Sequence, residues 1–202
     1  MSASATGRAG PGRPRSPETH RAILDAVAVL LAKGGCGAVS MEAVAAEAGV
    51  GKQTIYRWWP TKARLILEYL VAFVAEIRLP DEGNLAADLR AYLMGTLTSW
   101  TAGGFGPVVA ALMAEAQADP HFRETFFRDL IAGRRAAFQE LLRRGQARGE
   151  LGCDRNLDLL ADLIYGPMWY RLLLGHAPLD EQFINDLLGI LQLAPKASLD
   201  SL

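Results

Sequence analysis

The sequence predicts an all-α fold, with an N-terminal three-helix unit followed by a larger helical domain. Along most of the chain, apolar residues recur at steps of three and four, which places them on one face of an α-helix. No convincing strand pattern and no internal repeat occurs. Half of the 202 residues are hydrophobic, so the chain is long enough for one or two compact domains with a substantial core.

Residues 1–15 differ in composition from the rest of the chain. They are small, basic and rich in Gly and Pro, so they cannot bury enough apolar surface to fold alone, and we expect a disordered arm. The run Gly12-Arg13-Pro14-Arg15 resembles the core of an AT-hook, in which Arg13 and Arg15 would enter a narrow A·T-rich minor groove. The alternative is a solvated tail.

The first helix is predicted to begin after Ser16. The Ser16 side chain can cap it, Pro17 suits the first helical position, and Glu18 lies at the positive end of the helix dipole. Apolar residues then follow at helical spacing until the run Lys33-Gly34-Gly35 ends the helix. This helix should brace the segment that follows.

Residues 40–62 are predicted to form two short helices joined by a glycine turn. Ser40 is the expected N-cap of the first, and Gly49 supplies the positive φ that lets the second leave at a steep angle. This pattern is a helix-turn-helix, whose second helix enters the major groove of DNA. An ordinary helical hairpin with a solvated polar face is the competing interpretation.

The second of these helices carries the predicted contacts to DNA. Gln can pair bidentately with adenine and Arg with guanine, whereas Lys, Thr and Tyr can reach phosphate oxygens. The outward-facing candidates are Lys52, Gln53, Thr54, Tyr56 and Arg57.

A linking helix is expected next. Pro60 ends the recognition helix, Thr61 caps a fourth helix that runs to about residue 78, and the polar run 80–83 marks the domain junction. The predicted division is therefore a disordered basic arm over 1–15, a DNA-binding domain with its linking helix over 16–78, and an effector-binding and dimerisation domain over 79–202. Further helices are expected over about 85–100, 106–117, 120–145, 157–174 and 180–193.

Charge is divided unequally between the two halves. Residues 1–64 contain nine Lys or Arg and four acids, a balance of +5, whereas residues 65–202 contain twelve basic and eighteen acidic residues, a balance of −6. This is expected of a DNA-facing module joined to a body that avoids polyanions.

Other classes of partner are disfavoured. The longest apolar runs are far shorter than the ~20 residues that cross a bilayer, so we expect no membrane partner and a cytoplasmic location. Cys36 and Cys153 indicate no disulfide framework, and the three histidines lack metal-ligand spacing. We predict neither a metal site nor a cofactor, and no catalytic motif favours an enzyme. An architectural DNA-binding protein without a ligand would leave the long helical body unexplained.

The C-terminal domain is rich in large side chains that can line an apolar ligand cavity. Their ordinary role in a hydrophobic core is the alternative for each of them. The candidates for ligand binding are Trp100, Phe105, Met113, Phe127, Tyr165 and Trp169.

The chain resembles the TetR family of bacterial transcriptional regulators over about its first 65 residues. The resemblance is carried by Gly12-Arg13-Pro14-Arg15, by Ala22-Ile23-Leu24-Asp25-Ala26, by Ser40-Met41-Glu42-Ala43-Val44-Ala45, by Gly49-Val50 and by Thr54-Ile55-Tyr56-Arg57-Trp58-Trp59-Pro60-Thr61-Lys62. A looser similarity to TetR-like regulatory domains is carried by Asp119-Pro120, by Arg148-Gly149-Glu150-Leu151 and by Gly166-Pro167-Met168-Trp169-Tyr170-Arg171-Leu172.

The resemblance implies a homodimer that binds a double-stranded DNA operator and responds to a small-molecule effector of unknown identity. It implies phosphate contacts for Thr54, Tyr56 and Lys62, and a backbone-side position for Ser40. It also implies that the last two helices form the dimer interface. Gly51 departs from the pattern, since family members often have a capping Ser there. Trp59 matches a family position whose aromatic residue is usually structural. Trp58 could lie either in the core or at its rim.

Overall fold

A computed structural model describes residues 16–75 and 78–192, so the predicted arm with Arg13 and Arg15 lies outside the described residues. The N-terminal helices are α1 (Pro17–Ala38), α2 (Met41–Glu47) and α3 (Lys52–Trp58), followed by α4 (Lys62–Ala75). The later ones are α5 (Leu85–Trp100), α6 (Phe105–Ala118), α7 (Pro120–Phe126), the π-helical segment η1 (Phe127–Ile131), α8 (Ala132–Ala147), α9 (Leu157–Leu174) and α10 (Glu181–Gln192). All regular elements of the described residues are helical, which confirms the predicted all-α class.

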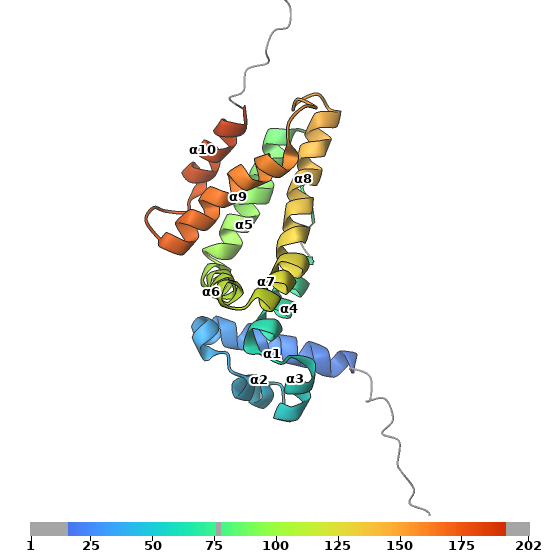
Figure 1. Ribbon diagram of the computed structural model, residues 1–202, viewed down its shortest axis with the longest axis vertical. Coiled ribbons are helices and arrows are strands. Elements are labelled where there is room, and N and C mark those ends of the chain that lie inside the picture. The colour runs from blue at the N-terminus through green and yellow to red at the C-terminus, as the bar shows by residue number, and fades with distance from the viewer. Residues whose placement is uncertain (1–15, 76–77, 193–202) are drawn as a thin grey trace, which may run out of the picture.

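The helices form two groups joined by a middle layer. Figure 1 shows α1, α2 and α3 at one end of the molecule and α5, α8, α9 and α10 at the other, with α4, α6 and α7 between them. One hydrophobic core joins α1–α4 to α6 and α7, and buries Ile23, Ile55 and Phe126. A second core lies among α5, α8, α9 and α10, around Phe138 and Ile164. The first core therefore ties the N-terminal unit to two helices of the larger domain.

Helix starts follow the predicted capping pattern. The Ser16 hydroxyl accepts a hydrogen bond from the Thr19 backbone at 3.4 Å, and the Ser40 hydroxyl accepts one from Ala43 at 3.0 Å. The Thr61 hydroxyl accepts one from Arg64 at 3.3 Å. Each bond satisfies one of the backbone N–H groups that a helix leaves unpaired in its first turn.

The end of α1 also follows the sequence pattern. The helical segment extends to Ala38, but the backbone is not helical at Gly34 and Gly35. Gly35 has φ +60°, in the left-handed region that a residue without a Cβ occupies at little cost. The glycine pair therefore interrupts the first helix where the sequence predicts its end.

Residues 120–147 are helical without a break, as the sequence predicts for 120–145, but the π-helical segment η1 lies between α7 and α8. Hydrogen bonds in a π-helix run from i to i+5, so one extra residue enters the turn and the later side chains are rotated relative to the earlier ones.

The contact between α5 and α8 generates a stability prediction. A Cβ added at Gly145 would lie 2.5 Å from one methyl carbon of buried Leu85 and 2.9 Å from the other. We expect Gly145→Ala to lower the free energy of unfolding by about 1–3 kcal/mol, the usual cost of overpacking. In mid-helix α5, a Cβ at Gly95 meets nothing within 4 Å, and Gly95→Ala should raise stability by about 0.5–1 kcal/mol. Urea denaturation followed by circular dichroism measures the stability of both variants. If Gly145→Ala were as stable as the wild type, the close packing of Gly145 on Leu85 would be contradicted.

Candidate nucleic-acid surface and ligand cavity

Helix α3 has one anchored face and one exposed polar face. Ile55 is fully buried and holds the helix on the first core. Of the predicted contact residues on α3, Thr54 is half-buried, whereas Lys52, Gln53, Tyr56 and Arg57 are exposed. Figure 1 places α3 at the outer end of the molecule, beside α2. The structure thus brings together the groove-facing side chains that the sequence predicts.

The turn between α2 and α3 sets the direction of α3. Gly49 has φ +65°, and the Val50 backbone N–H donates to the Ala45 carbonyl at 3.0 Å. These features close α2 and redirect the chain. Gly51 is then the N-cap of α3 and provides no side-chain hydrogen bond. The helix therefore lacks the side-chain cap that a Ser at this position could provide, as the sequence predicts.

Two of the predicted cations already have partners. The Lys52 ammonium lies 3.1 Å from a Glu42 carboxylate oxygen, and its hydrogen bond lowers the pKa of Glu42. The Lys62 ammonium donates to the Cys36 carbonyl oxygen at 3.1 Å, which places it beside the turn between α1 and α2. Exposed ion pairs contribute only about 0–1 kcal/mol, so a phosphate can displace Glu42 as the partner of Lys52.

A buried tryptophan ties α3 to α1 and α4. Trp59, at the end of α3, is only 2% exposed. Its indole N–H donates to one Glu68 oxygen at 2.6 Å, while the other Glu68 oxygen lies 2.6 Å from His20 Nε2. The His20 ring stacks on Trp59 with centroids 5.6 Å apart. Trp59 is structural, as the resemblance implies, and the adjacent Trp58 is half-buried at the rim, where Arg57 lies over its ring.

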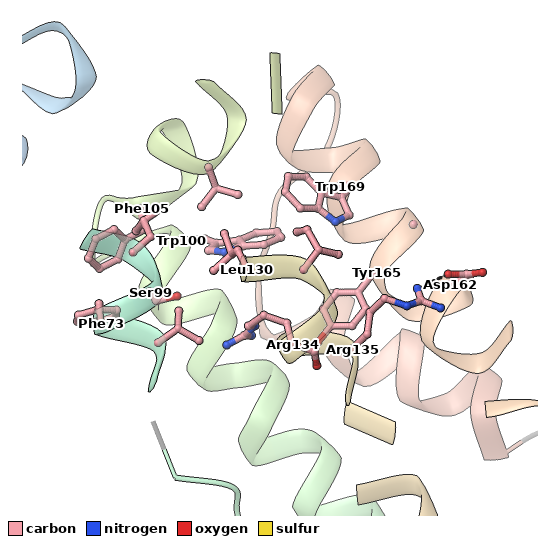
Figure 2. A pocket seen from close by; sticks show the side chains of 15 residues that line it. Phe73, Ser99, Trp100, Phe105, Leu130, Arg134, Arg135, Asp162, Tyr165 and Trp169 are labelled. Carbon is pink, nitrogen blue, oxygen red and sulfur yellow. Dashed lines mark hydrogen bonds and ion pairs between the residues drawn. The ribbon is translucent and has the colours of Figure 1, made fainter. Parts of the chain in front are cut away.

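A cavity of about 310 Å³ lies among α4, α5, α6, η1, α8 and α9. This volume is at the lower end of the range for small-molecule sites, about 300–1,000 Å³. Figure 2 shows aromatic side chains from α4, α5, α6 and α9 around it. The lining residues are Leu70, Phe73, Val74, Ser99, Trp100, Phe105, Val109, Leu130, Ile131, Arg134, Arg135, Asp162, Tyr165, Gly166 and Trp169.

Four of the six predicted ligand residues line this cavity: Trp100, Phe105, Tyr165 and Trp169. Met113 and Phe127 do not, which corrects the prediction. Met113 packs against the first core, and Phe127 is 53% exposed.

The π-helical segment explains the position of Phe127. In a regular α-helix, residues 127 and 134 would share a face, because seven residues complete almost two turns. The extra residue in η1 breaks this relation, so Arg134 reaches the cavity and Phe127 does not.

The polar part of the cavity was not predicted from the sequence. Figure 2 shows Arg134 within the cavity wall and Arg135 turned toward Asp162. Burial raises the pKa of Tyr165, so its hydroxyl remains protonated at neutral pH. No motif marks Arg134, since its neighbours in space come from distant parts of the chain.

Other site types have no support in residues 16–75 and 78–192. No group of three or more His, Cys, Asp or Glu there could hold a metal ion. No single helix of this part is long and apolar enough to cross a membrane; only α5 and α6 taken together pass that test, across a bend of 84°. Burial raises the pKa of the Cys36 thiol, which makes it a poor nucleophile.

Comparison with known proteins defines the class. Residues 23–69 match the model of bacterial regulatory proteins of the tetR family, and residues 79–191 match that of the tetracyclin repressor-like C-terminal domain. Over 177 residues the chain is 33% identical to the HTH-type transcriptional regulator YdeS of Bacillus subtilis, with 87% of this chain and 89% of the relative covered. It is 35% identical over 173 residues to the DNA-binding transcriptional repressor TetR of Mycobacteroides abscessus, covering 84% and 90%.

Solved structures agree. The TetR family transcription regulator SCO0332 superposes with a TM-score of 0.77 at 32% identity, over 88% of this chain and 100% of that one. FadR of Bacillus subtilis, crystallised with stearoyl-CoA, shares the fold with a TM-score of 0.65 at 16% identity, over 87% and 99%. The chain therefore belongs to the TetR family of helix-turn-helix transcriptional regulators. It is a DNA-binding regulator and not an enzyme.

The N-cap of α3 generates a second prediction. Gly51 has φ −72° and ψ 141°, which any residue adopts, and a Cβ there meets nothing within 4 Å. Gly51→Ser should therefore be tolerated and raise stability by a few tenths of a kcal/mol, because its hydroxyl can cap the helix. Gly49→Ser should instead lower stability by about 1–2 kcal/mol, because Gly49 has positive φ. Thermal denaturation distinguishes the two, and a stabilised Gly49→Ser variant would contradict the described turn.

Proposed function

We propose that this protein is a repressor that binds a palindromic operator as a homodimer and is released from it by a small, largely apolar ligand. The observation that carries the proposal is the shared role of α4. Its first residue, Lys62, donates a hydrogen bond to the Cys36 carbonyl oxygen near the end of α1, and its second half supplies Leu70, Phe73 and Val74 to the cavity wall. One rigid element thus connects the recognition unit to the ligand site.

On the DNA side, each protomer would place α3 in a major groove. Gln53 and Arg57 are the proposed base readers, while Lys52, Thr54, Tyr56 and Lys62 would contact phosphates, and Ser40 would lie beside the backbone. Dimer symmetry then demands half-sites about one helical turn apart, roughly 34–36 Å. Arg13 and Arg15 would add minor-groove contacts from the arm. The repressor relative from Mycobacteroides abscessus supports this direction of control.

The proposed dimer surface is an apolar stripe on α9. Positions 159, 163, 170 and 173 recur at helical steps of three, four and seven, so they share one face of the helix. Exposed apolar residues on that face would be costly in a monomer in water. The stripe consists of Leu159 (54% exposed), Leu163 (47%), Tyr170 (59%) and Leu173 (48%). Leu174 (61%) and Ile190 of α10 (58%) are exposed as well.

Most other apolar residues of these two helices belong to the chain's own core. Leu160 and Ile164 of α9 and Phe183, Leu187 and Leu188 of α10 are buried in the second core. The dimer surface proposed is therefore narrower than the two whole helices that the resemblance implies.

A ligand would act by changing the geometry of α4. Binding against Phe73 and Val74 would shift the helix, and the Glu68 bonds to Trp59 and His20 would carry the shift to α1 and α3. A coupling of ~1–3 kcal/mol gives a 5- to 150-fold loss of operator affinity. We further propose that residues 16–78 form the DNA-binding unit, that residues 79–202 bind the effector and dimerise, and that the protein acts in the cytoplasm.

Lys62 provides the test of the DNA surface. We expect Lys62→Ala to weaken binding to operator and to unrelated DNA alike, and to reduce the slope of log K against log salt by about one. Fluorescence anisotropy across a salt series, with the promoter fragment beside the protein's own coding sequence, measures this. Lys62→Arg retains the charge and should keep the slope.

Arg143 is the matched control, since it is exposed on α8 and paired with Glu140. Arg143→Ala should leave the slope unchanged. An unchanged slope for Lys62→Ala contradicts the phosphate contact, and absence of wild-type binding to that promoter contradicts the proposed function.

Leu163 provides the test of the dimer surface. Leu163→Glu would bury two charges against each other in a symmetric interface, so we expect a monomer at micromolar concentration. Size-exclusion chromatography with light scattering measures the mass. Val29→Glu, at an apolar position of α1 that is 38% exposed, should remain dimeric. A dimeric Leu163→Glu variant would place the interface elsewhere.

A further inference from the structure

The ligand cavity contains a cation without an acidic partner. Its charged lining residues are Arg134, Arg135 and Asp162, two positive charges and one negative, a net formal charge of +1. Arg135 forms ion pairs with both Asp162 and Asp158. In the described part of the chain, no carboxylate lies within ion-pair distance of Arg134. The surplus positive charge of the cavity therefore belongs to Arg134.

The Arg134 side chain is held in place by neutral groups. Its guanidinium donates a hydrogen bond to the hydroxyl of Thr96, a residue that is 4% exposed and itself donates to the Tyr92 carbonyl at 3.1 Å. The guanidinium carbon also lies 5.0 Å from the centroid of the Tyr92 ring. These contacts orient the group without neutralising it. A guanidinium has five N–H donors, and Thr96 engages one.

The main chain of Arg134 is anchored as well. Its carbonyl oxygen accepts a hydrogen bond from the Tyr92 hydroxyl at 3.1 Å and lies 3.3 Å from the Tyr165 hydroxyl. The two hydroxyls are 3.1 Å apart, so one can donate to the other while the second donates to this carbonyl oxygen. The position of the cation is thus fixed before any ligand arrives, which lowers the entropic cost of binding.

A second cavity, of about 290 Å³, has Arg134 in its wall too. The acid that lines it, Asp129, forms an ion pair with the adjacent Arg128. Arg134 therefore lines two cavities, and the acid in each lining is paired with another arginine.

We propose that the effector is a small organic monoanion, a carboxylate with a compact aromatic body, whose head group binds Arg134. This inference rests on the proposed function, because it defines the ligand class of the same cavity. A carboxylate matches the fork of guanidinium N–H groups and one surplus positive charge. The remaining wall, with Trp100, Phe105 and Trp169, suits a flat apolar body. A volume of about 310 Å³ and one surplus positive charge suit a compact monoanion better than a bulky or polyanionic ligand.

Three probes with one body and different head groups test the proposal: 2-naphthoate, neutral 2-naphthamide and cationic 2-naphthylmethylamine. Quenching of the fluorescence of Trp100 and Trp169, checked by calorimetry, measures their affinities for the full-length protein. We expect the carboxylate to bind at least tenfold more tightly than the amide, and the amine to bind most weakly. Equal binding of carboxylate and amide overturns the proposal, as does failure of all three to bind at millimolar concentration.

Arg134→Met removes the charge but retains much of the side-chain volume. Because hydrogen bonds to charged groups contribute ~1.5–3 kcal/mol, it should weaken naphthoate binding by roughly 10- to 150-fold and barely change naphthamide binding. Arg134→Lys keeps the charge and should retain most of the preference. The control is Arg143→Met, nine residues along α8 and hence on the opposite face, which should bind like wild type.

Circular dichroism shows whether each variant folds. If Arg134→Met does not fold, the role of Arg134 is tested by the affinities of Arg134→Lys and by the ranking of the three probes on the wild-type protein. A variant that folds and still prefers the carboxylate tenfold contradicts the role of Arg134.

Operator binding without any probe separates this inference from the proposed function. If the wild-type protein does not bind the operator, the proposed function itself is contradicted. Operator binding that is released equally by amide and carboxylate would retain the ligand-controlled repressor and refute the anionic head group.

Discussion

The two halves of α4 are packed into different parts of the molecule. Leu65, Ile66 and Leu67 are at most 2% exposed within the N-terminal core. About two turns later, Phe73 and Val74 form a wall of the ligand cavity. Because packed interiors have low compressibility and are close to crystal density, displacement of one end of this helix is felt at the other. This packing is the basis of our proposal that a ligand in the cavity changes the position of α3.

Polar contacts reinforce this connection on the DNA side. One Glu68 oxygen accepts a hydrogen bond at 2.6 Å from the Trp59 indole N–H, and the other lies 2.6 Å from His20 Nε2. A carboxylate in this half-buried place is strongly stabilised only when both oxygens have partners. The cluster joins the end of α3 to α1 and α4. These contacts hold α3 in place without involving its exposed residues.

On the ligand side, an aromatic wall is combined with one positioned charge. The apolar lining provides binding energy for many compact ligands, but it discriminates poorly among head groups. Arg134, oriented by Thr96 and by the Tyr92 ring, adds the discriminating element. Its charge has no acidic partner, since the acids nearby are already paired with other arginines. In the proposed site, the apolar wall would provide affinity and Arg134 selectivity.

The sequence by itself determined the features that depend on neighbours within about four positions. The caps at Ser16, Ser40 and Thr61, the break at Gly34 and Gly35 and the turn at Gly49 all follow from local backbone chemistry. Helical periodicity and the TetR-like motifs were sufficient for the fold class and the family. They also identified four aromatic residues of the cavity, because large side chains are few and must lie in a core or a pocket.

Only the tertiary structure decided which apolar faces meet one another and which face water. Leu159 and Leu160 are adjacent and chemically identical, yet one is 54% exposed and the other 4%. Likewise Arg134 and Arg135 differ in function only through partners 38 and 27 residues away, Thr96 and Asp162. The π-helical turn that removes Phe127 from the cavity is also set by packing. Such outcomes depend on contacts between distant segments, and spacing along the chain carries no information about them.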